Sequence, residues 1–326
     1  EALLFKAGAT TRLGKVQDQS SILDYTEESK EKRSSLDSAM GYFNYKGLHV
    51  NFVDTPGTMA FTGPAIAALS AVETAIVVIS AHAGIQVNPR RMFERARELN
   101  LGIWIVINHI DAANVDLPEL LNQVKESFGM QCVPINLPTQ GGKAVIDCFV
   151  NESGDADIED VGEAHTAMIE SLVGDDETMM EKYLSGEVSK DDVEKIAAKA
   201  IAHGACVPIF FTNSLGDVGV SQLLDALQSF ASSPLTGLKR TLSEGEKKSA
   251  IEPKKDGPFV GHVFKITTDP KSHIKYLSVR VHSGRLTPDM TVKSIKDPKG
   301  TRPGHVLRMI GADHKEIEAG SAGDII

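Results

Sequence analysis

The tetrapeptide Asp54-Thr55-Pro56-Gly57 directly follows an apolar, β-branched run at residues 48–53 that predicts a strand. An aspartate at the carboxyl end of such a strand can hold magnesium through water. A glycine there lets a backbone N–H approach a terminal phosphate, because it has no Cβ. Asp, Pro and Gly are also turn formers, so the tetrapeptide alone favours an ordinary turn.

A second polar motif, Asn108-His109-Ile110-Asp111, follows the predicted strand at residues 103–107. The carboxylate of Asp111 can accept two hydrogen bonds from the N1 and N2 edge of guanine, which adenine cannot supply. Each such charge-assisted bond contributes about 1.5–3 kcal/mol, so one aspartate can select the base. The alternative for this motif is a strand-end Asn that caps the next helix.

The third motif is Thr212-Asn213-Ser214, which follows a predicted strand at residues 207–211. Backbone N–H groups of this loop can bind the O6 atom of guanine. Each motif alone has a structural explanation, but three strand-end loops in this order are less expected by chance than any one of them. We therefore expect the three loops to form one site at the carboxyl edge of a sheet.

Short apolar runs alternate with stretches of helical periodicity in the first two thirds of the chain, which predicts an α/β domain. The two central runs are almost continuously apolar, as in strands that are buried on both faces of a mostly parallel sheet. The predicted strands are residues 48–53, 75–79, 103–107 and 207–211. The predicted helices are residues 89–99, 117–128, 190–203 and 220–231.

The chain of 326 residues is long enough for about two domains. We expect a first domain at residues 1–234, with a short acidic insert around 139–190, and a polar linker at 235–256. In residues 257–326, short alternating strands are separated by turn residues at roughly ten-residue spacing. This pattern predicts a small β-barrel domain.

The formal net charge is −10, and it is concentrated in one segment. Residues 151–195 hold 15 Asp and Glu but three Lys, so the remainder is slightly basic. From residue 257 onward, 11 Lys and Arg stand against seven acids, which permits contact with nucleic acid and is equally typical of a solvated face. Three widely spaced cysteines predict reduced, buried thiols, and the longest apolar stretch is too short to span a membrane.

The order of the motifs resembles that of the translational GTPases, and within them the elongation factor G group. Residues 24–57 align without a gap with that family's switch I and the strands after it. The barrel region resembles the family's second domain at residues 264–270, 281–284 and 322–325. The resemblance covers essentially the whole chain and implies a P-loop GTPase-type sheet with helices on both faces, followed by a small β-barrel.

The resemblance also implies GTP or GDP and Mg²⁺ as ligands. The residues that it assigns to the nucleotide are Asp54, Thr55, Pro56, Gly57, Asn108, His109, Asp111, Asn213 and Ser214. Magnesium is assigned to Asp54 and to Ser35, which aligns with the family's magnesium-binding Thr and keeps its hydroxyl. The family's G-x-x-x-x-G-K-[ST] loop is expected to end just before Glu1, so we expect both the first strand and the phosphate loop to be missing, and both ends to be truncations.

At two positions of the expected site, this chain has a different residue from the family. Thr58 stands where the family has the His that orients the attacking water, and a Thr can bond a water but cannot take its proton. Losing such a group costs roughly 100-fold to 10,000-fold in rate. His109 replaces the Lys of Asn-Lys-x-Asp, which leaves less positive charge near the phosphate loop.

Three functions therefore stay open from the sequence. The first is a cytoplasmic GTP hydrolase that acts on ribosomal RNA and proteins, and the second is a nucleotide-gated ribosome-binding factor with little or no hydrolysis. The third is a dinucleotide-dependent enzyme, which is disfavoured because no G-x-G-x-x-G follows any predicted strand. We expect a monomer away from the ribosome, no membrane contact and no sequence-specific DNA binding.

Overall fold

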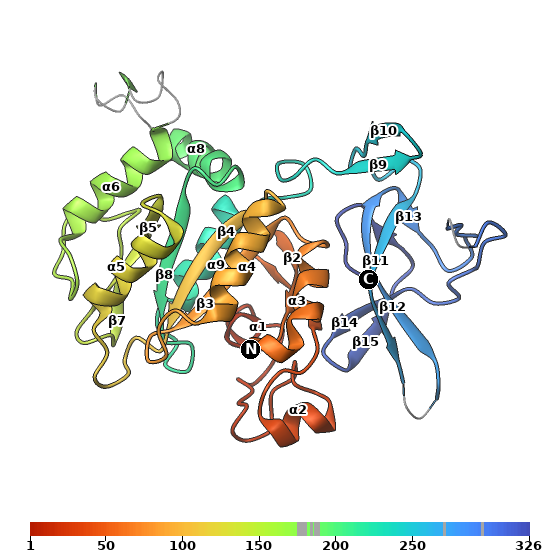
Figure 1. Cartoon of the computed structure of the whole chain (residues 1–326), viewed down its shortest axis with the longest axis horizontal. Coiled ribbons are helices and arrows are strands. Elements are labelled where there is room, and N and C mark those ends of the chain that lie inside the picture. Colours follow the sequence, from red (N-terminus) through yellow and green to blue (C-terminus); the bar gives the residue numbers. More distant parts are fainter. Residues whose placement is uncertain (175–180, 183–184, 186–189, 270–271, 295–296) are drawn as a thin grey trace.

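The computed structural model describes residues 1–174, 181–182, 185, 190–269, 272–294 and 297–326. Pro270 and part of the acidic segment at 151–195 lie outside the described residues. The first two thirds of the chain form an α/β domain, and residues 258–326 form a small β domain, on the right in Figure 1. The predicted order of an α/β domain followed by a β domain is confirmed.

Four parallel strands form the central sheet of the α/β domain, in the order β3-β4-β8-β5. Their bounds are β3 (Thr74–Ser80), β4 (Gly102–Asn108), β8 (Val207–Thr212) and β5 (Cys132–Pro134). Almost all of β4 and β8 is buried, as their continuous apolar sequences predict.

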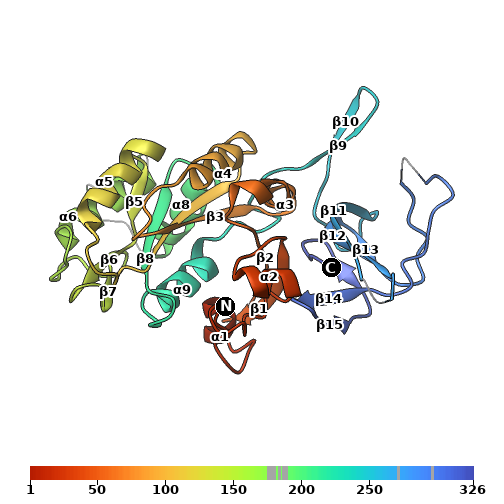
Figure 2. The ribbon, with the colours of Figure 1, turned by 60° about the horizontal axis from the view of Figure 1, so that its bottom comes forward.

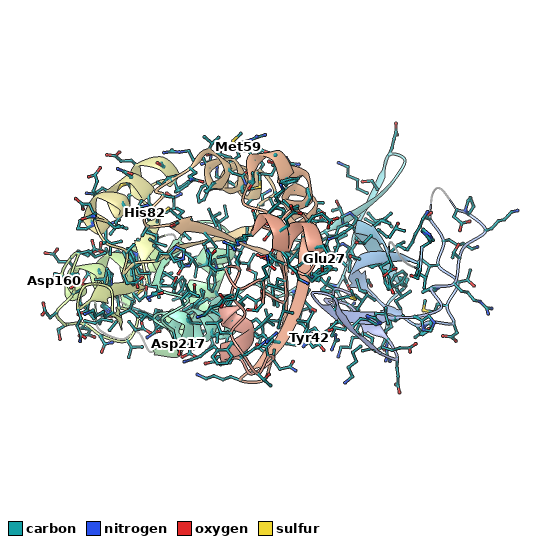
Figure 3. The ribbon with its side chains drawn as sticks, turned by 90° about the horizontal axis from the view of Figure 1, so that it is seen from below. Glu27, Tyr42, Met59, His82, Asp160 and Asp217 are labelled. Carbon is teal, nitrogen blue, oxygen red and sulfur yellow. The ribbon has the colours of Figure 1, made fainter. Side chains whose placement is uncertain are left out.

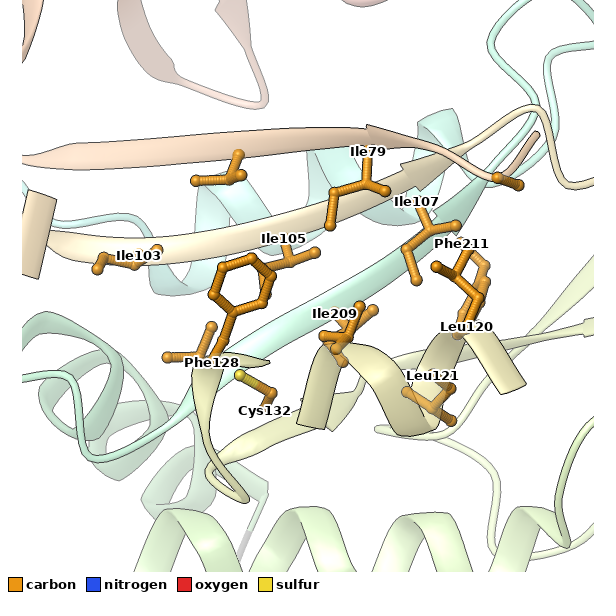
Figure 4. Packing of buried hydrophobic residues seen from close by; sticks show 14 of the residues in the cluster. Ile79, Ile103, Ile105, Ile107, Leu120, Leu121, Phe128, Cys132, Ile209 and Phe211 are labelled. Atoms are coloured by element: carbon orange, nitrogen blue, oxygen red, sulfur yellow. The ribbon is translucent and has the colours of Figure 1, made fainter. Parts of the chain in front are cut away.

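Alternation along β4 divides the core into two layers. Ile103, Ile105 and Ile107 face one apolar cluster, whereas Trp104 and Val106 face another. Helices α4 (Val87–Glu98) and α5 (Leu117–Phe128) pack on the first layer, part of which Figure 4 shows. Helices α1 (Ala2–Lys6), α8 (Lys190–Ala202) and α9 (Val220–Phe230) pack on the second. The expected helices on both faces are therefore confirmed.

Strands β1 (Ala39–Tyr45) and β2 (Leu48–Asp54) form an antiparallel hairpin that is a sheet of its own. In its register, Ala39 lies opposite Asp54. Figure 1 and Figure 2 both show this hairpin between the four-stranded sheet and the β domain. The hairpin therefore connects the carboxyl end of β2 with the junction between the two domains.

The β domain is built from three antiparallel strand pairs around a small apolar core. The pairs are β11 (Val260–Thr268) with β12 (Lys275–Ser283), β13 (Arg285–Leu286) with β16 (Gly320–Ser321), and β14 (Leu307–Ile310) with β15 (Asp313–Glu316). The segment at 235–256, expected to be a linker, contains a hairpin of β9 (Thr241–Glu244) and β10 (Lys247–Ala250).

The remaining elements connect these parts. They are α2 (Glu27–Lys32), the 3-10 helix η1 (Met59–Phe61), α3 (Thr62–Leu69), β6 (Asn136–Thr139), β7 (Ala144–Asp147) and α6 (Val161–Val173). All three cysteines are buried and free, and burial raises the pKa of each thiol to about 12. No helix among the described residues is both long and apolar enough to cross a membrane.

A buried ion pair joins the two domains. One guanidinium nitrogen of Arg280 on β12 donates to both carboxylate oxygens of Glu73, which precedes β3, at 2.7 and 2.8 Å. Both residues are at most 9% exposed, so neither charge has water to replace its partner. Arg240, in the segment between the domains, donates to the backbone oxygens of Ser70 and Val72 at 2.9 and 2.8 Å.

His282 stacks on His262 beside these arginines, with ring centroids 6.2 Å apart. Burial first, then Arg280, Arg240 and His262, lower the pKa of His282 to about 4. A base whose pKa falls on folding binds fewer protons in the folded chain than in the unfolded chain between pH 4 and its ordinary value near 6.5. We therefore expect His282 to stabilise the fold less as the pH falls through this window.

Thermal unfolding of the wild type and His282→Gln between pH 4.5 and 7.5 measures this contribution. The difference between the two midpoints should shift in favour of the variant as the pH falls below about 6.5. Midpoint curves that stay parallel across the range would contradict the expectation. Comparing the two proteins at each pH removes the contribution of all other titrating groups.

Candidate functional site

Three polar residues lie side by side where the central strands end. The register pairs Ser80 with Asn108, and Asn108 with Thr212, across β3, β4 and β8. Parallel strands bring their carboxyl ends to one edge, which is where open α/β sheets bind ligands. The structure thus brings together the Asn108–Asp111 and Thr212–Ser214 loops, as the sequence predicts.

The side chain of Asn108 joins these two loops directly. Its amide oxygen accepts hydrogen bonds from the Ser214 backbone N–H at 3.0 Å and from the Thr212 hydroxyl at 3.1 Å. Its amide nitrogen donates to the Ser214 hydroxyl at 3.1 Å. These bonds hold the loop after β8 against the end of β4, so the helix-capping alternative for Asn108 is not what the structure shows.

His109 takes a left-handed backbone conformation, with φ of 64°, directly after Asn108. One ring nitrogen, Nδ1, lies 3.2 Å from the Ser80 hydroxyl, and the other, Nε2, lies 3.4 Å from the Asn108 amide nitrogen. The amide nitrogen of Asn108 can only donate, so Nε2 of His109 is the acceptor. The ring proton is therefore assigned to Nδ1, which donates to the Ser80 hydroxyl. His109 therefore connects the ends of β3 and β4.

Asp111 is exposed at the end of this loop, and a tight turn packs against its backbone. The turn holds Gly142, where φ is 76° and a Cβ would lie 2.4 Å from the Ile110 carbonyl oxygen, so no larger residue fits. The N–H groups of Gly141 and Gly142 donate to Asp157 at 2.9 and 3.2 Å. The turn supports the Asp111 loop from behind and leaves its carboxylate open to a ligand.

Asp54 ends β2 and makes no ion pair with a lysine or arginine among the described residues. Burial is the first cause that raises the pKa of its carboxyl to about 6. Asp24 and Glu1 also raise this pKa, and the Thr55 backbone N–H lowers it. Burial disfavours the charged form of this carboxyl, and a cation bound beside it would favour that form.

The loop after Asp54 is exposed from Gly57 onward, and Pro56 is buried. Asn88 on α4 donates to the Gly57 carbonyl at 2.8 Å and so holds the loop toward the sheet. A Cβ on Gly57 would meet nothing within 4 Å, which leaves open space over its backbone. Thr58 precedes η1, and its side chain caps no backbone group of that helix.

Ser35 lies in the loop between α2 and β1, four residues before Ala39, which pairs with Asp54. Its hydroxyl has no hydrogen-bond partner in the part of the chain that the structure describes. A hydroxyl and a carboxylate are hard oxygen donors of the kind that Mg²⁺ takes, usually with one or two carboxylates and substrate phosphates. The donor set of Ser35 and Asp54 therefore fits that ion.

Within the described ranges, no group of three or more His, Cys, Asp or Glu side chains could hold a metal ion by itself. A shallow hollow does occur elsewhere, beside α6, where Asp160, Glu163, His165 and Glu170 contribute to its lining. Figure 3 shows Asp160 at the end of the molecule that is remote from the β domain. The hollow is thus separate from the strand-end loops.

Three residues that hold the site were not singled out in the sequence: Ser80, Asn88 and Asp157. No sequence signal marks Asn88 or Asp157, because each bonds to a backbone group far along the chain. Asn88 lies 31 residues from Gly57, and Asp157 lies 15 residues from Gly142. Asn213 turns away from the Asn108 network and instead accepts from the Gly216 N–H at 3.1 Å.

Comparison with known proteins gives two matches that divide the chain. Residues 1–233 match the elongation factor Tu GTP binding domain, and residues 258–326 match elongation factor G domain 2. Elongation factor G of Mycoplasma pneumoniae is 26% identical over 346 residues, which cover 100% of this chain and 50% of that protein. The chain therefore spans about half the length of the curated relative that it matches.

A solved structure supports the same comparison. The crystal structure of a protein from Thermus thermophilus matches with a TM-score of 0.83 and 29% sequence identity. The match covers 100% of this chain and 49% of that one.

The contacts of Asn108 generate a prediction that does not depend on any ligand. Asn108→Ala should lower the free energy of unfolding by about 1–3 kcal/mol, because it leaves polar groups of Thr212 and Ser214 unpaired. A double-mutant cycle with Ser214→Ala, measured by urea unfolding, should give a coupling energy of about 0.5–3 kcal/mol.

The matched control is Asn122→Ala, which removes an exposed amide from α5. Its effect should stay within about 0.5 kcal/mol and should add to that of Ser214→Ala. An additive result for Asn108 as well would show that its amide does not hold the loop after β8.

Proposed function

Because the chain belongs to the translational GTPases, with an elongation factor G-like arrangement of its domains, we propose that it binds GTP and GDP at the strand-end loops and hydrolyses GTP on the ribosome. The strand-end loops are those that follow β2, β4 and β8. The division into residues 1–234, the connecting segment 235–256 and residues 257–326 is part of this proposal.

The observation that carries the proposal is the hydrogen-bonded contact between Asn108 and Ser214. This contact fixes the loop after β8 beside the loop that carries Asp111. Asp111 would accept from the N1 and N2 edge of guanine. The N–H groups of Asn213, Ser214 and Gly216 are already hydrogen-bonded within the protein, so the Leu215 N–H is the one in this loop that would donate to O6. Adenine offers the reverse pattern at its edge, so this pair of loops favours guanine.

Asp54 and Ser35 are the residues that would hold magnesium. When bound, the ion neutralises charge on the phosphate oxygens. Asp54 supplies the negative charge for it, and the free Ser35 hydroxyl supplies a neutral oxygen. The backbone of Gly57 would sense the terminal phosphate, because the space above it is open.

Thr58 supports a second candidate function. Its side chain is exposed, next to the open backbone of Gly57, and its hydroxyl can hydrogen-bond to a water but cannot remove a proton from it. With this residue at the position of the family's histidine, the protein would act as a nucleotide-gated ribosome-binding factor with little or no hydrolysis. The two functions share every nucleotide contact and differ only in the chemical step.

The ribosome is the proposed partner in both cases. The slightly basic balance after residue 257 supports contact with ribosomal RNA, since positive charge is what neutralises phosphates. We propose a cytoplasmic protein that is monomeric away from the ribosome.

The base-reading assignment predicts that Asp111→Ala in the full-length protein weakens GTP binding by about 150-fold or more, as expected for the loss of two bonds of about 1.5–3 kcal/mol each. ATP binding should stay weak, because the variant gains no contact to adenine. Titration with fluorescent GTP and ATP analogues measures both affinities.

Glu126→Ala is the control for Asp111→Ala, because it removes an exposed negative charge from α5 in the same domain. Its GTP affinity should equal that of the wild type. If Asp111→Ala also binds GTP as tightly as the wild type, the assignment of this loop to the base is wrong.

The role of Thr58 is tested by GTP turnover of the full-length protein and Thr58→His, each with and without ribosomes. We expect the ribosome-stimulated rate of Thr58→His to exceed that of the wild type by about 100-fold or more, because a general base contributes this much. Flat wild-type turnover would favour the second candidate function. Strong stimulation of the wild type, unchanged by the substitution, would mean that another group positions the water.

A further inference from the structure

Lys265, on β11 of the β domain, reaches across the junction to the segment that contains Ser35. Its side chain is only 8% exposed, and its ammonium lies 2.9 Å from the Asp37 carboxylate. The same ammonium donates to the backbone oxygen of Ser38, which is itself buried. The Asp37 side chain is 52% exposed, so the buried Ser38 carbonyl is the partner that water cannot replace for this ammonium.

The partners of Lys265 are themselves linked. The second oxygen of Asp37 accepts from the Ser38 backbone N–H at 2.7 Å. Asp37 and Ser38 therefore form a short hydrogen-bonded unit, and Lys265 binds that unit at both its carboxylate and its carbonyl. The contact fixes backbone as well as side chain, so it restricts the path of the chain between Ser35 and β1.

This restricted segment lies next to both expected magnesium residues. Ser35 is three residues before Ser38, and Ala39, the next residue after Ser38, pairs with Asp54. On the β1 side, Met40 packs with Phe264, the neighbour of Lys265, in an apolar cluster. The Gly311 N–H, from the β14–β15 turn, donates to the Met40 carbonyl at 2.9 Å.

A further contact along β1 also joins this strand to the β domain. The Arg308 guanidinium of β14 lies 5.3 Å from the centre of the Tyr42 ring, and Figure 3 shows Tyr42 where the two domains meet. The β domain therefore binds the beginning of β1 from several positions. Of the four cationic side chains named at this junction, which are Arg240, Arg280, Arg308 and Lys265, Lys265 is the one that binds the segment next to Ser35.

We propose that Lys265 is a positioning residue that couples the conformation of the Ser35 segment, and hence nucleotide binding, to the β domain. The inference rests on the proposed function, since it takes Ser35 as a residue of the magnesium and GTP site. When the Ser35 loop closes on the nucleotide, Lys265 supplies a fixed point for its C-terminal end. By reciprocity, bound GTP strengthens the contact between Lys265 and the Ser35 segment by the same free energy.

The effect should distinguish GTP from GDP. A loop that closes through magnesium on the terminal phosphate contributes to GTP binding and contributes little to GDP binding. Lys265→Met removes the charge and both hydrogen bonds but keeps an apolar side chain of similar length. We expect it to weaken GTP binding by about 10-fold in magnesium, and GDP binding by less than about 2-fold.

Two control variants separate this coupling from general damage. Lys275→Met removes an exposed lysine from β12, the strand paired with β11, and should leave both affinities unchanged. Arg240→Met removes the two bonds to Ser70 and Val72, which loosens the same junction without touching the Ser35 segment. It should not change the ratio of GTP affinity to GDP affinity. Lys265→Arg keeps the charge and should restore most of the ratio.

A second measurement does not involve nucleotide. Hydrogen exchange of the backbone amides at residues 34–39, in the nucleotide-free full-length protein, should be about 10-fold faster in Lys265→Met than in wild type and unchanged in Lys275→Met. This readout reports the hold of Lys265 on the segment even where binding is not measured.

Each outcome decides a different point. If the wild type binds no GTP, the proposed function fails and the coupling fails with it. If the wild type binds GTP but Lys265→Met keeps the wild-type GTP-to-GDP ratio, the coupling alone is overturned, and it is also overturned if Arg240→Met lowers the ratio equally. Unchanged exchange at residues 34–39 would show that Lys265 does not position the segment.

Discussion

The hydrogen bonds of the Asn108 side chain are the constraint on which the site depends. One amide group hydrogen-bonds to the backbone N–H of Ser214 and to the hydroxyls of Thr212 and Ser214. These bonds fix the carboxyl ends of β4 and β8 relative to one another. A polar network of this kind specifies one arrangement, because any displacement leaves part-buried groups unpaired. The loops that would bind a base are thus positioned by the sheet register rather than by their own flexibility.

A second constraint lies at the junction between the domains. Glu73 and Arg280 neutralise one another out of contact with water, and the nearby apolar cluster of Met40, Ala71, Phe264 and Ile325 excludes solvent next to them. Since a lone charge there would be costly, the two domains keep one relative placement in the structure. The β1–β2 hairpin lies inside this junction. The strand pairing of the hairpin places Ala39, at the start of β1, opposite Asp54, at the end of β2.

Under the proposed function, the base side and the phosphate side of the site differ in their chemistry. On the base side, Asn108 and Ser214 are hydrogen-bonded to one another, and Asp111 is open and supported from behind by the Gly142 turn. On the phosphate side, Asp54 carries a carboxyl with a raised pKa, Ser35 has a free hydroxyl, and Thr58 has no group that takes a proton. In that case the base contacts are held in place before the nucleotide binds, whereas Thr58 offers a hydrogen bond but no base to the attacking water.

The sequence by itself determined the α/β class, the strands that end at Asp54, Asn108 and Thr212, and the small β domain. These features depend on local periodicity and on which residues follow a strand, and both are readable along the chain. Only the tertiary structure decided that Asn88 holds Gly57, that Asp157 holds the Gly142 turn and that Lys265 holds Ser38. Each of those contacts joins residues distant in sequence, and no spacing pattern encodes them, because the partner on the site side is in every case a backbone group that any residue would present.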